Sequence, residues 1–540
     1  MRRVSLVVLL ALGFLPGSAS GQYPTVDRAI VAATPAITAI RHRIHQNPEL
    51  SNRETETAAL VAAHLRELGL EVRTGVAHTG VVGILRGGRP GPVIAVRADM
   101  DALPVTEDTP LPFKSTKRVQ WQGAEVGVMH ACGHDIHTST QLGLATVLAG
   151  MKADLPGTVV FIFQPAEEGA PPGEEGGASL MLKEGAFANP RPEAVFGFHV
   201  SAGLEVGKIR YAIGPALSAA DIFRATITGR QAHGAAPHLS VDPIVTASQA
   251  VLALQTIRSR NTPPLEPSVL TVGVLRGGQR FNIIPATVEL EGTVRTFSLA
   301  VQDTYERRIR EILDGITSSA GASFTLEYLR TYPATINDTT LTHRSVPSLA
   351  KAIGASNVVL WEPWMASEDF SYFANTVPGF FFSLGMVKPG TTSGDHHTPT
   401  FLADDPDLLA LRECFTAAAE THGVPVALLE SLAWQESAWD NDRVGDNGTV
   451  GIAQLNDATV EFINDELVVG PALDPDIRAE NIELMAAYLD HLLDETDGSW
   501  AATVAAYRLG LSASRAERWD ADTQGYITTV LAGVPDFEAA

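Results

Sequence analysis

Short apolar runs alternate with helical patterns between residues 26 and 205, and this alternation restricts the fold more than any other feature. Residues 36–50 and 54–70 carry apolar residues at helical spacing, whereas 93–97 and 158–164 are short β-branched runs typical of buried strands. The pattern predicts an α/β sheet. Polar motifs follow both runs at the carboxyl ends of the expected strands, where open α/β sheets bind their ligands.

Residues 216–330 have a different pattern. Strands are expected at 221–229, 268–274 and 287–296, and helices at 243–259 and 301–320. Two helices against a small sheet predict an α+β insert. The first pattern resumes near Tyr332 and continues to about residue 420. The sequence therefore predicts one α/β catalytic domain, residues 26–215 and 331–420, interrupted by an inserted domain at 216–330.

Residues 421–540 have only helical patterns, at 425–439, at 479–495 and from 501 onward, which predicts a separate all-α domain. The charge changes at the same place. Residues 416–540 contain 23 acids, five arginines and no lysine, so they carry −18 of the net −23. No Gly/Ser/Pro linker precedes them, and we expect a shared or abutting helix near 420–423. So acidic a surface argues against a nucleic-acid partner.

The first 21 residues resemble a secretory signal, with Arg2 and Arg3 before an apolar run at 4–15 and small residues at 18–20. An exported protein, periplasmic or extracellular, is therefore expected, with an uncleaved N-terminal anchor as the alternative. No later segment reaches 18 uninterrupted apolar residues, so a membrane-embedded protein is not expected. The two cysteines, Cys132 and Cys414, are not expected to pair, because Cys132 lies in a metal-like motif.

That motif, residues 130–137, places one thiol and three imidazoles within eight residues. Lone histidines are usually structural, but a cluster this dense is more typical of a metal site. Further acid and imidazole groups end other expected strands, at 164–169, at 196–199 and at 395–399. Each of these is a weak signal alone, and together they predict a metal centre at one edge of the sheet.

These strings also occur in a known family. Residues 36–415 resemble the aminoacylase/carboxypeptidase family of metallo-hydrolases, in particular its hippurate-hydrolase and auxin-conjugate amidohydrolase branch. The matching strings are RADMDALP at 97–104, HACGHD at 130–135, QPAEEG at 164–169, GRQAHGAAP at 229–237, NIIP at 282–285 and HTPTF at 397–401. Their order and spacing cover nearly 400 residues.

The resemblance implies an amidohydrolase of N-acyl amino acids or short peptides that binds two divalent metal ions. The metal ligands it implies are Cys132, His134, Glu168, His199 and His397. Such a donor set suits Zn, Mn, Co or Ni. His397 fits better than His396 because the family histidine stands two residues before the proline. His137 is expected to be a neighbour.

The resemblance also implies roles for residues that do not bind metal. Glu167 would be the general base, kept off the metal because a metal-bound carboxylate is a weak base. Asp101, and with it Asp99, would orient ligands. The insert resembles a dimerisation or lid domain, so a homodimer is expected. There His233 would steady the oxyanion, with an ordinary turn histidine as the alternative, and Asn282 would help to bind the substrate carboxylate.

Residues 421–533 resemble a lytic transglycosylase, or goose-type lysozyme, domain. The matching strings are HGVP at 422–425, LAWQES at 432–437 and GIAQL at 451–455. Glu436 follows an apolar helical face, where a raised pKa would suit a general acid for glycosidic bonds. Gln454 and Tyr507 would contact the glycan of peptidoglycan, although Arg508 replaces the family asparagine.

Three interpretations remain open from the sequence. The first is an amidohydrolase with a second module directed at the cell wall. The second gives the glycan lyase the main activity and makes the metallo domain a peptide trimmer. In the third, the acidic tail only binds glycan or only packs.

Overall fold

A computed structural model describes residues 24–532 except 112, 438, 440, 442, 446–447 and 516–518. The predicted export segment, residues 1–21, lies outside the described residues. The chain folds into two compact units. Of the described residues, one contains 24–37, 48–105 and 118–402, and the other contains 38–47, 106–117 and the chain from Ala403 onward. Within the described part of the chain, no helix combines the length and apolarity needed to cross a bilayer.

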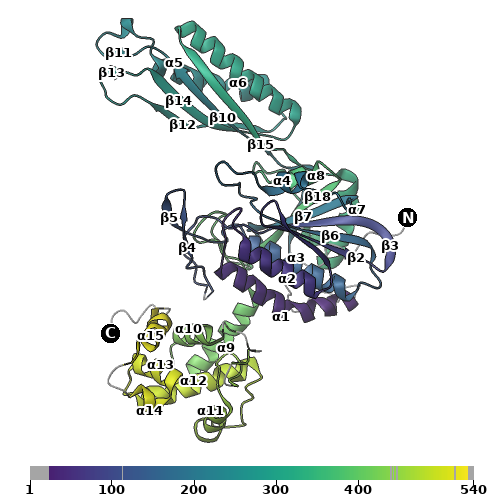
Figure 1. Ribbon diagram of the computed structural model, residues 1–540, viewed down its shortest axis with the longest axis vertical. Coiled ribbons are helices and arrows are strands. Elements are labelled where there is room, and N and C mark those ends of the chain that lie inside the picture. Colours follow the sequence, from purple (N-terminus) through teal and green to yellow (C-terminus); the bar gives the residue numbers. More distant parts are fainter. Residues whose placement is uncertain are drawn as a thin grey trace. The chain divides into compact units, whose positions relative to one another are not determined.

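An eight-stranded sheet forms the centre of the first unit, in the order β1-β2-β6-β3-β7-β18-β8-β17. Figure 1 labels β2, β3, β6, β7 and β18 of this sheet. Its strands are β1 (Glu71–Val76), β2 (Gly80–Arg86), β3 (Arg89–Asp99), β6 (Pro156–Gln164), β7 (Ala194–Glu205), β8 (Ile209–Tyr211), β17 (Val358–Leu360) and β18 (Gly379–Val387). The neighbours β6, β3, β7 and β18 are parallel, whereas β2 and β8 pair antiparallel at the flanks. The predicted α/β fold is confirmed.

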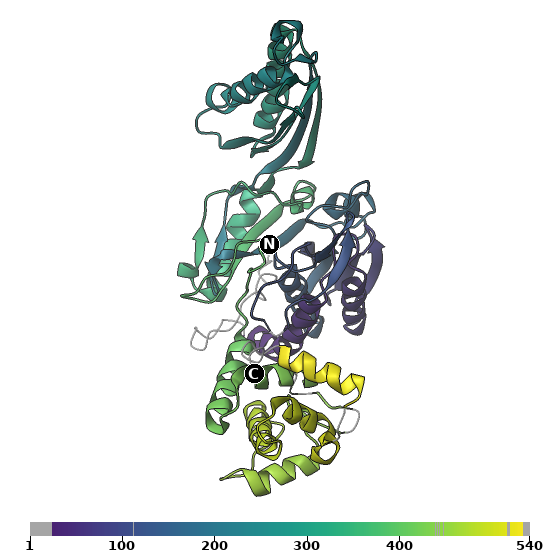
Figure 2. The ribbon, with the colours of Figure 1, turned by 90° about the vertical axis from the view of Figure 1, so that its left-hand side faces the viewer.

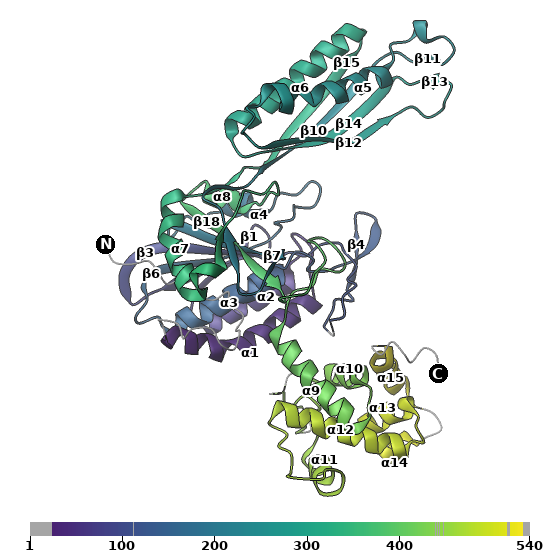
Figure 3. The ribbon, with the colours of Figure 1, turned by 180° about the vertical axis from the view of Figure 1, so that it is seen from behind.

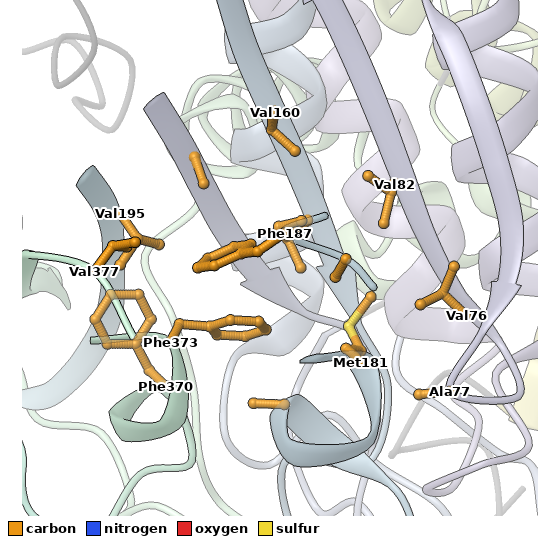
Figure 4. Packing of buried hydrophobic residues seen from close by; sticks show 14 of the residues in the cluster. Val76, Ala77, Val82, Val160, Met181, Phe187, Val195, Phe370, Phe373 and Val377 are labelled. Atoms are coloured by element: carbon orange, nitrogen blue, oxygen red, sulfur yellow. The ribbon is translucent and has the colours of Figure 1, made fainter. Parts of the chain in front are cut away.

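Helices cover both faces of this sheet. Helices α2 (Thr55–Glu67) and α3 (His134–Gly150) lie on one side, and α4 (Gly177–Lys183) and α8 (Phe370–Ala374) lie on the other (Figure 1). The α4/α8 side buries an apolar cluster in which Phe187 and Phe373 have ring centroids 5.0 Å apart (Figure 4). This packing fixes α8 against the sheet, and with it Glu368 and Asp369, the two acidic residues that precede α8.

The insert forms its own four-stranded antiparallel sheet in the order β12-β14-β10-β15. The strands are β10 (Ala219–Thr228), β12 (Ser268–Gly277), β14 (Thr287–Thr296) and β15 (Ser323–Tyr332). Helices α5 (Pro243–Leu254) and α6 (Leu299–Ala320) pack on one face of it, as seen in Figure 3 and from the side in Figure 2. The sequence predicted three of these strands. It missed β15, which has no fully buried residue.

The second unit is helical, as predicted. Its helices are α9 (Pro406–His422), α10 (Val426–Ser437), α11 (Asp457–Phe462), α12 (Arg478–Glu495), α13 (Trp500–Leu509), α14 (Leu511–Ser514) and α15 (Ala521–Ala532). Helix α9 packs against α10 and α12, so this unit includes the chain from Ala403 onward and begins earlier than the predicted start at 421. Phe113, on the segment 106–117, is buried in it between His42 and Trp434, with ring centroids 4.0 and 6.0 Å away.

Candidate metal centre

A turn at Cys132 and Gly133 brings the thiol and His134 to the carboxyl edge of the main sheet. Gly133 precedes α3 with φ of 86°, and a Cβ at this position would come within 2.4 Å of Val200 Cγ2. The turn therefore requires glycine. His134 begins α3, while β3 and β6 end at Asp99 and Gln164, so the predicted convergence of motifs at this edge is observed.

Two groups of candidate ligand atoms share the Cys132 thiol. Cys132, His134 and Glu168 form one group, and Cys132, His199 and His396 form the other, each with its ligand atoms within 4.8 Å of one another. Nε2 of His134 is buried without a hydrogen-bond partner among the described residues and lies 3.9 Å from Glu168 Oε1. A buried imidazole nitrogen without a partner is costly, and a metal ion would satisfy it. The donor set therefore fits divalent metal ions.

Electrostatics at the cluster also fit a cation. Burial, together with Glu168 and Glu167, raises the pKa of the Cys132 thiol well above its usual value. Burial lowers the pKa of His134, but Asp99, Asp101 and Glu168 outweigh it and bring the value to about 10. The acidic neighbours contribute to both shifts, and a divalent cation would neutralise their negative charge while favouring the thiolate.

Two hydrogen bonds engage both ring nitrogens of His137. Its Nδ1 lies 2.5 Å from Asp99 Oδ1, and its Nε2 accepts the backbone N–H of Val200 at 2.9 Å. Burial lowers the pKa of His137 to about 4, which keeps the ring neutral. A neutral histidine with both nitrogens engaged agrees with the expected role of a neighbour.

The two adjacent histidines of the 395–399 string, His396 and His397, contact different groups. His397 Nε2 lies 3.1 Å from Glu168 Oε1. His396 Nδ1 lies 3.6 Å from the Cys132 thiol, and its Nε2 accepts the Ala202 N–H at 3.2 Å. The sequence singled out His397, yet among the described residues the group of ligand atoms around the thiol includes His396 and not His397. Both histidines line the cavity beside the cluster.

Asp101 ties the ends of two strands together. Its carboxylate accepts the backbone N–H groups of Glu167 and Glu168, both at 3.1 Å, and the Ser51 hydroxyl at 2.8 Å. The same carboxylate lies 3.2 Å from His134 Nδ1 and thereby directs Nε2 toward the cluster. These contacts fit a group that orients ligands.

A buried guanidinium lies behind the cluster, and the sequence analysis did not identify it. Arg97 is fully buried and contacts Asp99 at 2.5 Å, Glu368 at 2.8 Å and Asp369 at 2.9 Å. It also donates to Gln164 Oε1 at 2.8 Å. The one sequence feature that could have indicated this cluster is the adjacent acidic pair 368–369 before an aromatic-rich helix. Its pairing with Arg97 could not be predicted without the fold, because 271 residues separate Arg97 from Glu368.

Glu167 lies against this acidic pair. Its Oε1 accepts the backbone N–H of Asp369 at 3.4 Å, and its own carbonyl accepts the Tyr332 hydroxyl at 2.8 Å. Burial raises its pKa well above the usual value, as do Glu368, Glu168 and Asp369. The adjacent carboxylates of Glu167 and Glu168 therefore have different surroundings.

A cavity of about 560 Å³ opens onto the cluster. Cys132, Glu167, Glu168 and both histidines of the 395–399 string line it. Its remaining wall holds two arginines and several aromatic side chains: Arg210, Arg295, Tyr211, Tyr332, Trp361 and Trp364.

His233 and Asn282 lie together at the tip of the insert, and neither lines this cavity. The two-stranded pairing of β11 (Ala232–His233) with β13 (Ile283–Ile284) brings them together. Nδ1 of His233 accepts the Ala235 N–H at 3.0 Å, and the side chain is exposed. Phe281, beside Asn282, is 96% exposed.

In the helical unit, Glu436 is half-buried and accepts a hydrogen bond from the Tyr526 hydroxyl. Burial raises the pKa of Glu436, against lowering by Tyr526 and Arg508. The Arg508 guanidinium lies over the Tyr526 ring at 4.5 Å and pairs with Asp522 at 2.5 Å. The arginine that departs from the family string therefore lies beside the proposed acid.

The other two glycan-contact candidates are bonded to protein. The Gln454 amide donates to the Arg443 and Gly451 carbonyls at 3.0 and 2.9 Å and accepts from Thr449 at 3.0 Å. The Tyr507 hydroxyl donates to the Ala453 carbonyl at 2.7 Å, and burial, with Glu436, raises its pKa. Both side chains hold the loop around 449–454 in this conformation.

An α/β sheet with a thiol, imidazole and carboxylate cluster at its carboxyl edge defines a metallo-hydrolase, and comparison with known proteins agrees. Residues 95–421 match peptidase family M20/M25/M40, and residues 413–528 match the transglycosylase SLT domain. The chain therefore belongs to the M20/M25/M40 family of metallo-peptidases and amidohydrolases and carries a transglycosylase domain. Both resemblances predicted from the sequence are confirmed.

Individual relatives support the assignment. The chain is 40% identical to IAA-amino acid hydrolase ILR1-like 2 of Arabidopsis thaliana, over 67% of this chain and 79% of that one. It is 38% identical to N-acetyl-L-cysteine deacetylase of Bacillus subtilis, over 68% and 83% of the two chains. A solved structure of the Bacillus subtilis YXEP protein, described as a dinuclear metal binding peptidase, aligns with a TM-score of 0.59 at 34% identity, covering 70% and 95%.

Proposed function

We propose that this chain is an exported, two-metal amidohydrolase that cleaves the amide bond of N-acyl amino acids or short peptides. The hydrolase and deacetylase relatives act on such amides by name, and the YXEP relative is described as dinuclear. The SLT domain and the basic and apolar residues at 1–15 support export to the compartment that holds peptidoglycan.

The cluster around Cys132 would hold the two ions. Cys132, His134 and Glu168 would hold one, and the same thiol with His199 would hold part of the other. His397, whose Nε2 lies 3.1 Å from Glu168 Oε1, would complete the second set, with Zn, Mn, Co or Ni as suitable metals. When bound, such a pair supplies Lewis-acid chemistry, which activates water and polarises an amide carbonyl. Asp101 would orient His134 and the ends of the two strands, and Asp99 would orient the neighbouring His137.

One observation carries the assignment of the base, namely the different surroundings of Glu167 and Glu168. Glu168 faces the imidazoles of His134 and His397, whereas Glu167 faces Glu368 and Asp369. Glu167 can therefore remain unligated beside the cavity, take a proton from the attacking water, and give it to the departing nitrogen.

Replacing Glu167 by Gln tests this role. We expect Glu167→Gln to bind metal normally and to lose amide hydrolysis by a factor on the order of a hundred or more. The matched control is Glu175→Gln, an exposed glutamate eight residues away that pairs with Lys183 at 2.7 Å. Steady-state hydrolysis and elemental analysis give the two readouts. Near-normal turnover by a metal-loaded Glu167→Gln protein would reject the assignment.

The insert would act as a dimerisation or lid domain. His233 and Asn282 are adjacent, yet neither lines the metal cavity of its own chain, and the exposed Phe281 and Ile283 surround them. In a homodimer they would reach the partner's cavity, His233 to steady the oxyanion and Asn282 to bind the substrate carboxylate. Mixing His233→Ala chains with Glu167→Gln chains tests this, because only a dimer that shares sites recovers activity.

The helical unit would cleave glycan strands, with Glu436 as the general acid. Its carboxyl group is half-buried, has a raised pKa, and is held by the Tyr526 hydroxyl. We expect Glu436→Gln to abolish release of anhydromuropeptides from peptidoglycan and to leave amide hydrolysis unchanged. Absence of any such release by the parent protein would support the alternative of a tail that only binds glycan.

A further inference from the structure

The register of the main sheet places an arginine in line with one of the metal-site histidines. Ser383 of β18 pairs with His199 on one side and with Arg210 of β8 on the other. Residues paired directly across strands point to the same face of a sheet. His199, Ser383 and Arg210 all line the cavity, which agrees with this geometry.

The Arg210 side chain extends back toward β7 and is held on two sides. Its guanidinium donates to the Ser201 hydroxyl at 2.7 Å and lies 5.3 Å from the centroid of the Trp361 ring. Stacking on an aromatic face and one hydrogen bond fix the plane of a guanidinium while its other donors remain available.

Arg210 also lacks a counter-charge. None of the ion pairs among the described residues involves it, in contrast to Arg97, which contacts three carboxylates in the same unit. A half-buried, oriented guanidinium without an acidic partner is well suited to bind an anion that enters the cavity, and a carboxylate matches its fork.

We propose that Arg210, held against Trp361, binds a second carboxylate of the substrate, one that lies beyond the α-carboxylate of the amino acid released. The inference rests on the proposed amidohydrolase function and names the substrate class of that same site. It makes the chain selective for acidic amides, whether the carboxylate lies on the acyl side or on the amine side.

The distance between the metal-site histidine and the arginine's partner on β7 indicates which substrates carry a carboxylate at the right place. Ser201 is two residues beyond His199 on the same strand, which is roughly 7 Å at about 3.3 Å per residue. An extended chain covers about the same distance in two residues. The α-carboxylate of the released amino acid lies within one residue of the scissile nitrogen and is too close. The distance suits an acidic side chain, a following residue or a dicarboxylic acyl group.

Matched substrate pairs test the proposal. On the amine side the pair is N-acetyl-L-glutamate and N-acetyl-L-glutamine, and on the acyl side it is N-succinyl-L-alanine and N-succinamoyl-L-alanine. Metal-loaded full-length protein is assayed as wild type, Arg210→Met, Arg210→Lys and the control Arg86→Met, whose parent arginine is an exposed residue of the same sheet. We expect the wild type to prefer the acidic member of at least one pair, as measured by kcat/KM.

In Arg210→Met the acidic-to-neutral ratio of kcat/KM for that pair should fall roughly 10- to 100-fold, the usual worth of a charge-assisted hydrogen bond. Arg210→Lys should be intermediate, because it keeps the charge and loses the fork. Arg86→Met should keep the wild-type ratio. The pair that responds identifies the side on which the carboxylate lies. Equal losses for both members, or no loss for either, would overturn the proposal.

A binding measurement separates this proposal from the proposed function. Calorimetric titration of the four probes into metal-loaded Glu167→Gln protein, with and without Arg210→Met, requires no turnover. If none of the probes is hydrolysed by wild type but the acidic ones bind more tightly and lose that advantage with Arg210→Met, the carboxylate site stands and the assigned reaction fails. If acidic and neutral probes bind Glu167→Gln alike, the carboxylate site is refuted.

Discussion

Replacing Arg97 by Met should destabilise the first unit strongly and in a pH-dependent way. The guanidinium is fully buried and contacts Asp99, Glu368 and Asp369, whose side chains are at most 3% exposed. Methionine fills similar space without charge, so three buried carboxylates lose their cation. Breaking a buried ion pair from one side costs roughly 3–5 kcal/mol, and at neutral pH we expect a loss of that order in the free energy of unfolding.

The pH dependence follows from the direction of the pKa shifts. Burial raises the pKa of Asp99, but His134, His137 and Arg97 hold it well below the usual value. Burial raises the pKa of Asp369 to about 7 even though Arg97 lowers it. Without Arg97 both pKa values move up, so the folded variant holds protons that the unfolded chain releases above about pH 4. The variant's deficit should therefore grow as pH rises from 5 to 8.

Urea unfolding at pH 5.5 and at pH 7.5, at fixed metal concentration and followed by circular dichroism, measures this effect. The control is Arg86→Met, because Arg86 pairs with Glu71 at 2.7 Å on the exposed edge of the same sheet and should change little. A deficit that is the same at both pH values, or no larger than that of the control, would refute the argument that Arg97 neutralises this cluster.

Two further predictions concern ligand identity and domain dependence. His397→Ala should lower metal content and amide hydrolysis together. His396→Ala should retain both metals, because the Nε2 of His396 already accepts the Ala202 N–H. Elemental analysis of both variants measures this, and the reverse result would assign the ligand to His396. A chain that ends near Glu420 should keep amide hydrolysis but unfold at a lower temperature, because removal of Trp434 exposes the Phe113 ring that packs against it. A folded, metal-loaded but inactive fragment would contradict the separation of the two activities.

The sequence predicted the sheet edge well because the information there is local. Asp99 and Gln164 each follow a short apolar run, and the string at 130–137 is dense enough to stand out without a fold. Parallel strands then bring such ends to one edge by geometry alone. The all-helical fold of the tail could also be predicted from the sequence, because the charge and the hydrophobic periodicity both change near residue 420.

The parts that the sequence did not predict depend on long-range pairing. Arg97 and the acidic pair 368–369 meet only because β3 and the segment before α8 converge across 271 residues. The register that aligns Arg210 with His199 exists only after β18 inserts between β7 and β8. No local pattern encodes which strand pairs with which, so these partners could not be derived from spacing.

The two proposed catalytic glutamates, Glu167 and Glu436, differ in how their charge is balanced, and this predicts different responses to metal removal. Burial and the carboxylates of Glu368 and Glu168 raise the pKa of Glu167 well above its usual value. Divalent cations beside Glu168 would offset that negative charge and let Glu167 ionise and act as a base. Burial also raises the pKa of Glu436, but the groups that lower this pKa are Tyr526 and Arg508, both part of the helical unit.

A chelator should therefore abolish amide hydrolysis and leave any glycan cleavage intact, as measured on one preparation with both substrates. If glycan cleavage fell in parallel and returned with the same metal titration, Glu436 would not act independently of the metal centre.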